Sequence, residues 1–99
     1  MVAQSVKTIR FGAGRLDYAQ ACEMAGRVGL ALPGRYVQLH LERTTEATLA
    51  ALARLIVLRR ELLRGGGDLC IVGLSGRAED LYRLSRLERI LPRRPGASA

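Results

Sequence analysis

The sequence contains no tryptophan and few aromatic residues of any kind, with one phenylalanine and three tyrosines. A hydrophobic core must therefore be built from leucine, valine, isoleucine and alanine, which the 48% apolar content allows. Proteins that bind single-stranded nucleic acid usually stack bases on aromatic side chains or carry a recognised module. This chain has neither feature, so we expect no nucleic-acid partner although its formal net charge is +7.

Long apolar segments and clustered metal ligands are also missing. No stretch reaches the roughly 20 apolar residues of a membrane-spanning helix, and the start, MVAQSVKTIRF, lacks the apolar run of a secretory signal. Both features favour a cytoplasmic location. The two cysteines, Cys22 and Cys70, form no ligand pattern with the single histidine. We therefore expect two buried reduced thiols, with no disulfide, metal or cofactor.

Basic charge comes almost entirely from arginine, since only Lys7 is a lysine. Such a bias reflects a GC-rich coding sequence as readily as a function. Many of the arginines lie in the C-terminal third, where glutamate and aspartate are interspersed with them. A solvated basic face is the simpler interpretation, and an acidic partner is the alternative.

Hydropathy periodicity predicts three successive strand–helix units. The expected strands are Lys7–Phe11, Tyr36–Leu41 and Leu69–Val72. The second alternates, as in a sheet covered on one side, whereas the third is continuously apolar, as in a strand buried on both faces. The expected helices are Tyr18–Val28, Glu46–Arg64 and Arg77–Ser85. Helical connections of this length imply parallel strands and right-handed crossovers.

These elements predict a single compact α/β domain over residues 1–92, with a small and mainly parallel sheet, followed by a flexible tail over residues 93–99. Asp17 and Gln20 form a capping-box-like pair at the start of the first helix. Thr44 or Thr45 is expected to cap the second helix, and Ser75 the third.

The second helix has an unusually wide apolar arc. One stripe, formed by Ala51, Leu55, Leu58 and Leu62, is expected to face the sheet. A neighbouring stripe contains Leu52, Ile56 and Leu63, with Arg59 at its side. Either the third helix and the C-terminal turn cover this second stripe, or it docks a partner. The sequence leaves both interpretations open.

Residues that suggest chemistry are few. The turn from Gly73 to Gly76 lies between a strand and a helix, where an anion could bind, but it lacks the lysine of a phosphate-binding loop. His40 lies two residues before Glu42, and such a pair could move protons, yet no nucleophile stands at a fixed spacing from it. We expect no catalytic residue and no enzyme activity. A small anion- or nucleotide-binding domain is an alternative function.

The order of motifs from residue 7 to residue 91 resembles the STAS family, the fold shared by anti-sigma-factor antagonists and the tails of sulfate transporters. The resemblance is carried by FGAGRLDYA, YVQLHLE, TLAALARLIVLRREL, GGGDLCIVGLS and LYRLSRLERIL, in that order. It implies a bacterial, non-catalytic interaction domain that regulates transcription by binding an anti-sigma factor. In that family, the anti-sigma factor is also a kinase, which phosphorylates a serine of an Asp-Ser-Ser-Gly motif at the start of the long helix.

This chain departs from the family motif at the switch itself. Aligning Leu52 with the leucine of the motif places Thr48, Leu49, Ala50 and Ala51 where Asp-Ser-Ser-Gly would stand. A phosphate there would add nearly two negative charges beside the binding surface, and the serine that would carry it is absent. Thr45 and Thr48 remain as candidate phosphorylation sites, with helix capping as their simpler role.

The resemblance implies a partner-binding surface around the start of the second helix, comprising Thr44, Thr45, Thr48, Leu49, Ala50, Leu52, Ile56 and Arg59. Compact STAS subunits of this length also occur in bacterial ABC complexes that move phospholipid, where they bind the ATPase subunit. The size of the chain and its ending in ILPRR make such a subunit an alternative. A sheet edge that a second copy or a partner would close makes a homodimer a further expectation.

Overall fold

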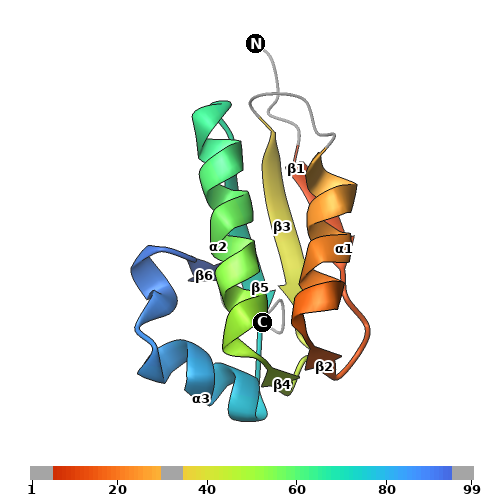
Figure 1. The fold of residues 1–99 in the computed structure, drawn as a ribbon, viewed down its shortest axis with the longest axis vertical. Coiled ribbons are helices and arrows are strands. Elements are labelled where there is room, and N and C mark those ends of the chain that lie inside the picture. Colours follow the sequence, from red (N-terminus) through yellow and green to blue (C-terminus); the bar gives the residue numbers. More distant parts are fainter. Residues whose placement is uncertain (1–5, 30–34, 95–99) are drawn as a thin grey trace.

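The central sheet has all its connecting helices on one side (Figure 1). The computed structural model of the protein describes residues 6–29 and 35–94. Four parallel strands lie in the order β1-β3-β5-β6, with bounds Val6–Arg10, Tyr36–Leu41, Asp68–Gly73 and Arg93–Arg94. Each connection steps to the next strand in the same direction, and right-handed crossovers then place every helix on the same face. Helices α1, Tyr18–Gly29, and α2, Leu49–Arg64, pack side by side on that face.

The remaining elements gather at one end and one edge of the sheet. Strands β2, Arg15–Leu16, and β4, Glu46–Ala47, pair in parallel as a separate two-stranded ribbon. Helix α3, Gly76–Leu84, packs against β4, and the short 3-10 helix η1, Leu87–Arg89, leads into β6. The predicted small α/β domain with a mainly parallel sheet is therefore confirmed.

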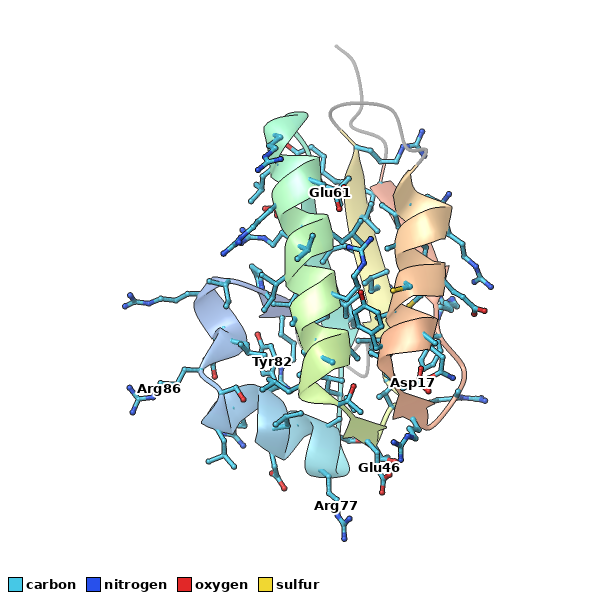
Figure 2. The ribbon with its side chains drawn as sticks, in the orientation of Figure 1. Asp17, Glu46, Glu61, Arg77, Tyr82 and Arg86 are labelled. Atoms are coloured by element: carbon cyan, nitrogen blue, oxygen red, sulfur yellow. The ribbon has the colours of Figure 1, made fainter. Side chains whose placement is uncertain are left out.

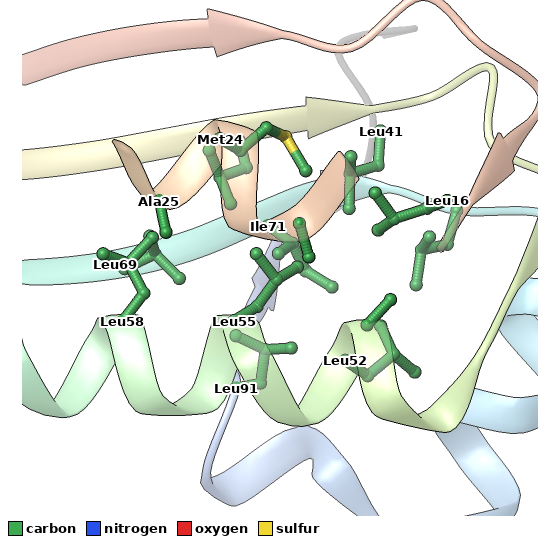
Figure 3. Close-up of a cluster of buried hydrophobic side chains, with 14 of the residues drawn as sticks. Leu16, Met24, Ala25, Leu41, Leu52, Leu55, Leu58, Leu69, Ile71 and Leu91 are labelled. Atoms are coloured by element: carbon green, nitrogen blue, oxygen red, sulfur yellow. The ribbon is translucent and has the colours of Figure 1, made fainter. Parts of the chain in front are cut away.

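The core lies between the sheet and the two long helices (Figure 3). Leu16, Leu41 and Leu52 fill it near the start of α2, and Leu58 and Leu69 fill it near the other end of that helix. Each of these side chains is at most 2% exposed. Burial of a leucine side chain contributes about 1.5–3 kcal/mol relative to leaving it in water. Aliphatic side chains thus build the core that the shortage of aromatic residues predicted.

The opposite face of the sheet carries no helix among the described residues (Figure 1). In β3, residues alternate as predicted between buried and half-buried, so that Gln38 and His40 lie on the bare face. The prediction that β5 is buried on both faces was wrong at Cys70, which is partly exposed, whereas Val72 on the same face is buried. Cys22 is partly exposed too, so neither thiol is fully buried as expected. Three crossovers of one hand put no helix on the second face of the sheet, which leaves Cys70 of the central strand partly exposed.

The start of α1 matches the sequence prediction, whereas the start of α2 does not. Asp17 and Gln20 form a reciprocal capping box, in which each backbone N–H donates to the side chain of the other at 2.9 Å. Helix α2 begins at Leu49 rather than Glu46, and Thr48 is its N-cap, accepting a hydrogen bond from the Ala51 amide at 3.1 Å. Glu46 and Ala47 are held extended in β4, so the predicted caps Thr44 and Thr45 were wrong.

The C-terminal elements also differ slightly from the prediction. Helix α3 begins at Gly76 and ends at Leu84, one residue earlier at each end, and Ser75 precedes it without a side-chain capping bond. Arg93 and Arg94 pair with β5, so the sheet continues into the segment that was predicted to be a tail. The rest of that predicted tail, residues 95–99, lies outside the described residues.

Candidate functional site

The three threonines before α2 have different structural roles. Thr44 is completely buried, and its hydroxyl donates to the Ala13 carbonyl at 3.4 Å, so it cannot contact a partner directly. Thr45 is exposed, but its backbone is held firmly: its N–H donates to Gly14 at 2.9 Å and its carbonyl accepts from Ala78 at 2.8 Å. Thr48 is half-buried and caps the helix. The segment is therefore a rigid support for the helix start.

The second apolar stripe of α2 is covered from within the chain over its first two residues. Leu52 is fully buried, and Ile56 packs against the core. Arg59 donates to the Asp68 carboxylate at 2.8 Å and to the Ile90 carbonyl at 3.3 Å, which ties the C-terminal segment to the side of the helix. Of the predicted partner-binding residues, Leu52 is therefore interior and Arg59 is already engaged.

A buried hydrogen bond holds this covering segment in place. The hydroxyl of Tyr82, on α3, donates to the Leu91 carbonyl at 2.6 Å, and Leu91 itself is fully buried against α2 (Figure 3). Burial is the main cause that raises the pKa of the Tyr82 phenol, Glu88 adds to it, and Arg93 opposes it. The C-terminal turn thus covers the second stripe at Leu52 and Ile56, whereas Leu63, its last residue, remains 44% exposed.

A different arc of α2 remains uncovered. Leu49 and Val57 are 55% and 46% exposed, and Ala50 and Ala53 are exposed as well. Leu49, Ala53 and Val57 follow one another at intervals of four residues, which aligns them along one side of the helix. We call Leu49, Ala50, Ala53 and Val57 the α2 apolar face. It has no polar or charged member.

Leu49 and Ala50 belong to the predicted binding surface, whereas Ala53 and Val57 were not predicted to be part of it. A signal was available, because both lie on the side of the helix opposite the sheet-facing stripe that begins with Ala51 and Leu55. Apolar residues on that side have no partner within a two-layer domain.

Charged residues, most of them arginines, border the α2 apolar face at both ends. Arg60 and Arg64 are exposed and continue the same side of the helix toward its C-terminus. Arg77 points outward at the opposite end, near the start of α2, where Glu46 also lies (Figure 2). Glu46 is 3.9 Å from Arg15, in an exposed pair. Glu61, four residues after Val57, is exposed on the same side of the helix. The face is therefore an apolar strip whose border carries both signs of charge, with arginine in the majority.

In the turn after β5, several of the backbone donors that an anion would use are bonded within the fold. Leu74 N–H donates to Leu41, Ser75 N–H to Thr44 and Ala78 N–H to Thr45, all backbone carbonyls, at 2.8–3.2 Å. The strand order never reverses, so the sheet lacks the switch-point crevice in which α/β proteins bind nucleotides.

The glycine that opens this turn has a packing role. Gly73 adopts a φ of +98°, and a Cβ at this position would lie 2.6 Å from the Cα of Glu42. Only glycine fits a left-handed conformation at such a close approach. The glycines that suggested phosphate binding are therefore explained by the fold.

The histidine lies in a hydrogen-bonded row on the bare face of the sheet. His40 Nδ1 is 3.0 Å from a Glu42 carboxylate oxygen, and Nε2 is 3.3 Å from the Gln38 side-chain oxygen. Both ring nitrogens thus have protein partners. A neighbouring hollow of about 340 Å³ is lined by His40, Glu42, Arg10 and Arg43, among others. Within residues 6–29 and 35–94, no group of three or more His, Cys, Asp or Glu side chains could hold a metal ion.

Comparison with known proteins gives no family assignment: no protein-family model matches the chain, and no curated protein matches its sequence. In the described parts of the chain, every helix is too short or too polar to cross a membrane. The α2 apolar face is therefore the main functional candidate that the geometry provides.

Proposed function

We propose that this chain is a non-catalytic protein-interaction domain, which docks its partner on the α2 apolar face. The single observation that carries the proposal is the exposure of four apolar residues that lie along one side of α2 over successive turns. Apolar side chains scattered singly on a surface are ordinary, but a continuous apolar strip with a polar border is typical of an interface.

The support beneath this face favours the same role. Thr48 caps the helix, and hydrogen bonds from Thr45 and Glu46 to the Gly14 carbonyl fix the chain that leads into it. Binding a partner on a preformed helix loses little conformational entropy, so more of the contact energy remains as affinity. Thr45 and Thr48 border the face, and phosphorylation of either would place negative charge beside it.

The resemblance to STAS domains suggests what the partner is. On that basis we propose a cytoplasmic bacterial regulator, similar to an anti-sigma-factor antagonist, that binds a kinase-like anti-sigma factor without the usual phosphoserine switch. The alternative partner is the ATPase subunit of a phospholipid-transport ABC complex. The anion-binding alternative has little support, since the amides of Leu74 and Ser75 in this turn are used by the fold.

The test measures binding of the purified chain to purified anti-sigma kinases and transporter ATPase subunits encoded in the same genome. Val57→Glu should weaken the true complex by at least about tenfold, because a charge would be buried against apolar surface. Leu84→Glu is the matched control, since Leu84 is 83% exposed on α3, away from this face. It introduces the same charge and should leave the dissociation constant unchanged.

Two results would contradict the proposal. Equal weakening by both substitutions would show that charge, rather than the α2 apolar face, controls binding. Tight binding that survives Val57→Glu would place the interface elsewhere. Which of the two purified partner classes binds decides between the anti-sigma and transporter alternatives.

A further inference from the structure

Strand β1 forms one edge of the central sheet, on the side away from β6. Within residues 6–29 and 35–94, no strand pairs with its outer side. Val6, Thr8 and Arg10 are all exposed, and they alternate with Lys7 and Ile9, which are less exposed. An exposed strand edge is a template for pairing with another chain.

The direction of the free backbone groups can be derived from the β1–β3 ladder. Phe11 N–H donates to the His40 carbonyl at 3.0 Å, so the backbone groups of Phe11 point toward β3. Because these directions alternate along a strand, Lys7 and Ile9 also face β3. The N–H and C=O groups of Val6, Thr8 and Arg10 therefore point out from the sheet edge.

These outward groups are self-complementary. In an antiparallel pair of two β1 strands centred on Thr8, the residue numbers of opposing positions add to sixteen. Thr8 then faces Thr8 of the second copy, and Val6 faces Arg10, so that outward-pointing residues always meet one another. This register uses every outward group of the strand.

The side chains agree with this register. Each charged residue of β1 lies opposite an uncharged one: Arg10 opposite Val6, and Lys7 opposite Ile9. Opposing threonines are a favourable cross-strand pair, and no like charges lie directly opposite each other. Lys7, the residue type that usually guards an edge, instead donates to the Arg27 carbonyl of α1 at 3.4 Å.

We propose that two copies of the chain associate through their β1 edges as antiparallel neighbours centred on Thr8, forming one continuous eight-stranded sheet. The two-fold axis is perpendicular to the sheet, so the helices of both copies lie on the same face. The α2 apolar faces remain uncovered, since α2 lies on the far side of α1 from this edge (Figure 1). The dimer would therefore present two docking faces to a bivalent partner.

A single pair of short strands buries less surface than the roughly 1,000 Å² of a stable interface, so the expected dimer is weak and concentration-dependent. Sedimentation equilibrium of the full chain should give an average mass that rises from one toward two chains between micromolar and millimolar concentration. Small-angle scattering at high concentration should show an elongated particle.

Two substitutions at one position test the register. Val6→Glu would place a carboxylate opposite Arg10 of the second copy and should lower the dissociation constant of the dimer. Val6→Arg would place two arginines opposite each other and should raise it. Each change occurs twice in the symmetric dimer, so we expect shifts of roughly tenfold in opposite directions.

A third substitution tests the backbone. Thr8→Pro removes an outward N–H without touching the β1–β3 ladder, and edge strands tolerate proline. It should give a folded monomer, whereas Thr8→Ala should retain the dimer. A chain that stays monomeric to millimolar concentration would overturn the proposal, as would shifts of the same sign for both Val6 variants. Neither result depends on the partner that binds α2.

Discussion

Helix α2 carries two apolar arcs, one covered by the rest of the chain and the other exposed to solvent. One, around Leu52 and Ile56, is covered by the segment that runs from α3 to β6. The other, the α2 apolar face, is left open. Leucine and a β-branched residue occur in both, Leu52 and Ile56 in the first and Leu49 and Val57 in the second, so the residue type does not decide which arc is core. The presence of a covering segment from the same chain decides it, and the open arc is the one available to another molecule.

The largest expected difference between the arcs is in their contribution to stability. Leu52→Ala should lower the free energy of unfolding by about 2–5 kcal/mol, because it leaves a cavity beneath the covering segment. Leu49→Ala, three residues away on the same helix, should change it by less than about 0.5 kcal/mol. Urea unfolding of both variants measures the contrast. Similar losses for the two would mean that the open arc is also packed.

The hydrogen bond that holds the covering segment, the chain from α3 to β6, has the next largest expected effect on stability. Tyr82→Phe removes the hydroxyl and leaves the buried Leu91 carbonyl without its 2.6 Å donor. An unsatisfied buried acceptor costs about 1–3 kcal/mol. Thermal unfolding should show the loss, and hydrogen exchange should show faster opening of the segment around Leu91. An unchanged melting temperature would mean that the carbonyl finds another donor.

The ion pair on the outside of the cover contributes less. Arg59 contacts Asp68 at 2.8 Å, but the Asp68 side chain is 39% exposed, so solvent screens the pair. Arg59→Met keeps much of the packed stem and should cost about 1 kcal/mol. Arg60→Met, on the exposed neighbour, is the control and should have almost no effect on the urea midpoint. A larger loss at Arg60 would contradict the assignment of Arg59 as the contact to the cover.

Alkaline pH should weaken the attachment of the covering segment in the wild-type protein as well. Burial raises the pKa of Tyr82 above its ordinary value of 10.0, with Glu88 adding to the shift and Arg93 opposing it. A raised folded-state pKa gives stability that is complete below the unfolded pKa and is lost as pH rises through the folded value. The wild-type urea midpoint should therefore fall above about pH 10, more steeply than that of Tyr82→Phe. Equal slopes would contradict this.

The sequence predicted the elements that have strong local signals. Alternation placed β3, and the Asp17–Gln20 capping box placed the start of α1. The ribbon of β2 and β4 has only two residues per strand, and its pairing joins segments about thirty residues apart. No local pattern encodes such a contact, which is why α2 was expected to begin at Glu46.

The candidate site was predictable only in part, for a related reason. Periodicity identifies which residues of α2 share a side, but exposure depends on where the chain returns after β5. Thr44 has a typical surface side chain, yet it is completely buried, with its hydroxyl bonded to the distant Ala13 carbonyl. Val57 is β-branched and apolar, as core residues often are, yet residues 6–29 and 35–94 leave it 46% exposed.

The central claim is that the open arc of α2, rather than the covered side, binds the protein partner. Two double substitutions of nearly equal exposure test it: Leu49→Ala with Val57→Ala on the open arc, and Leu63→Ala with Ile90→Ala beside the cover. The dissociation constant of the partner complex should rise at least about tenfold for the first pair and less than about twofold for the second. The reverse order, or no change for the first pair, would contradict the account.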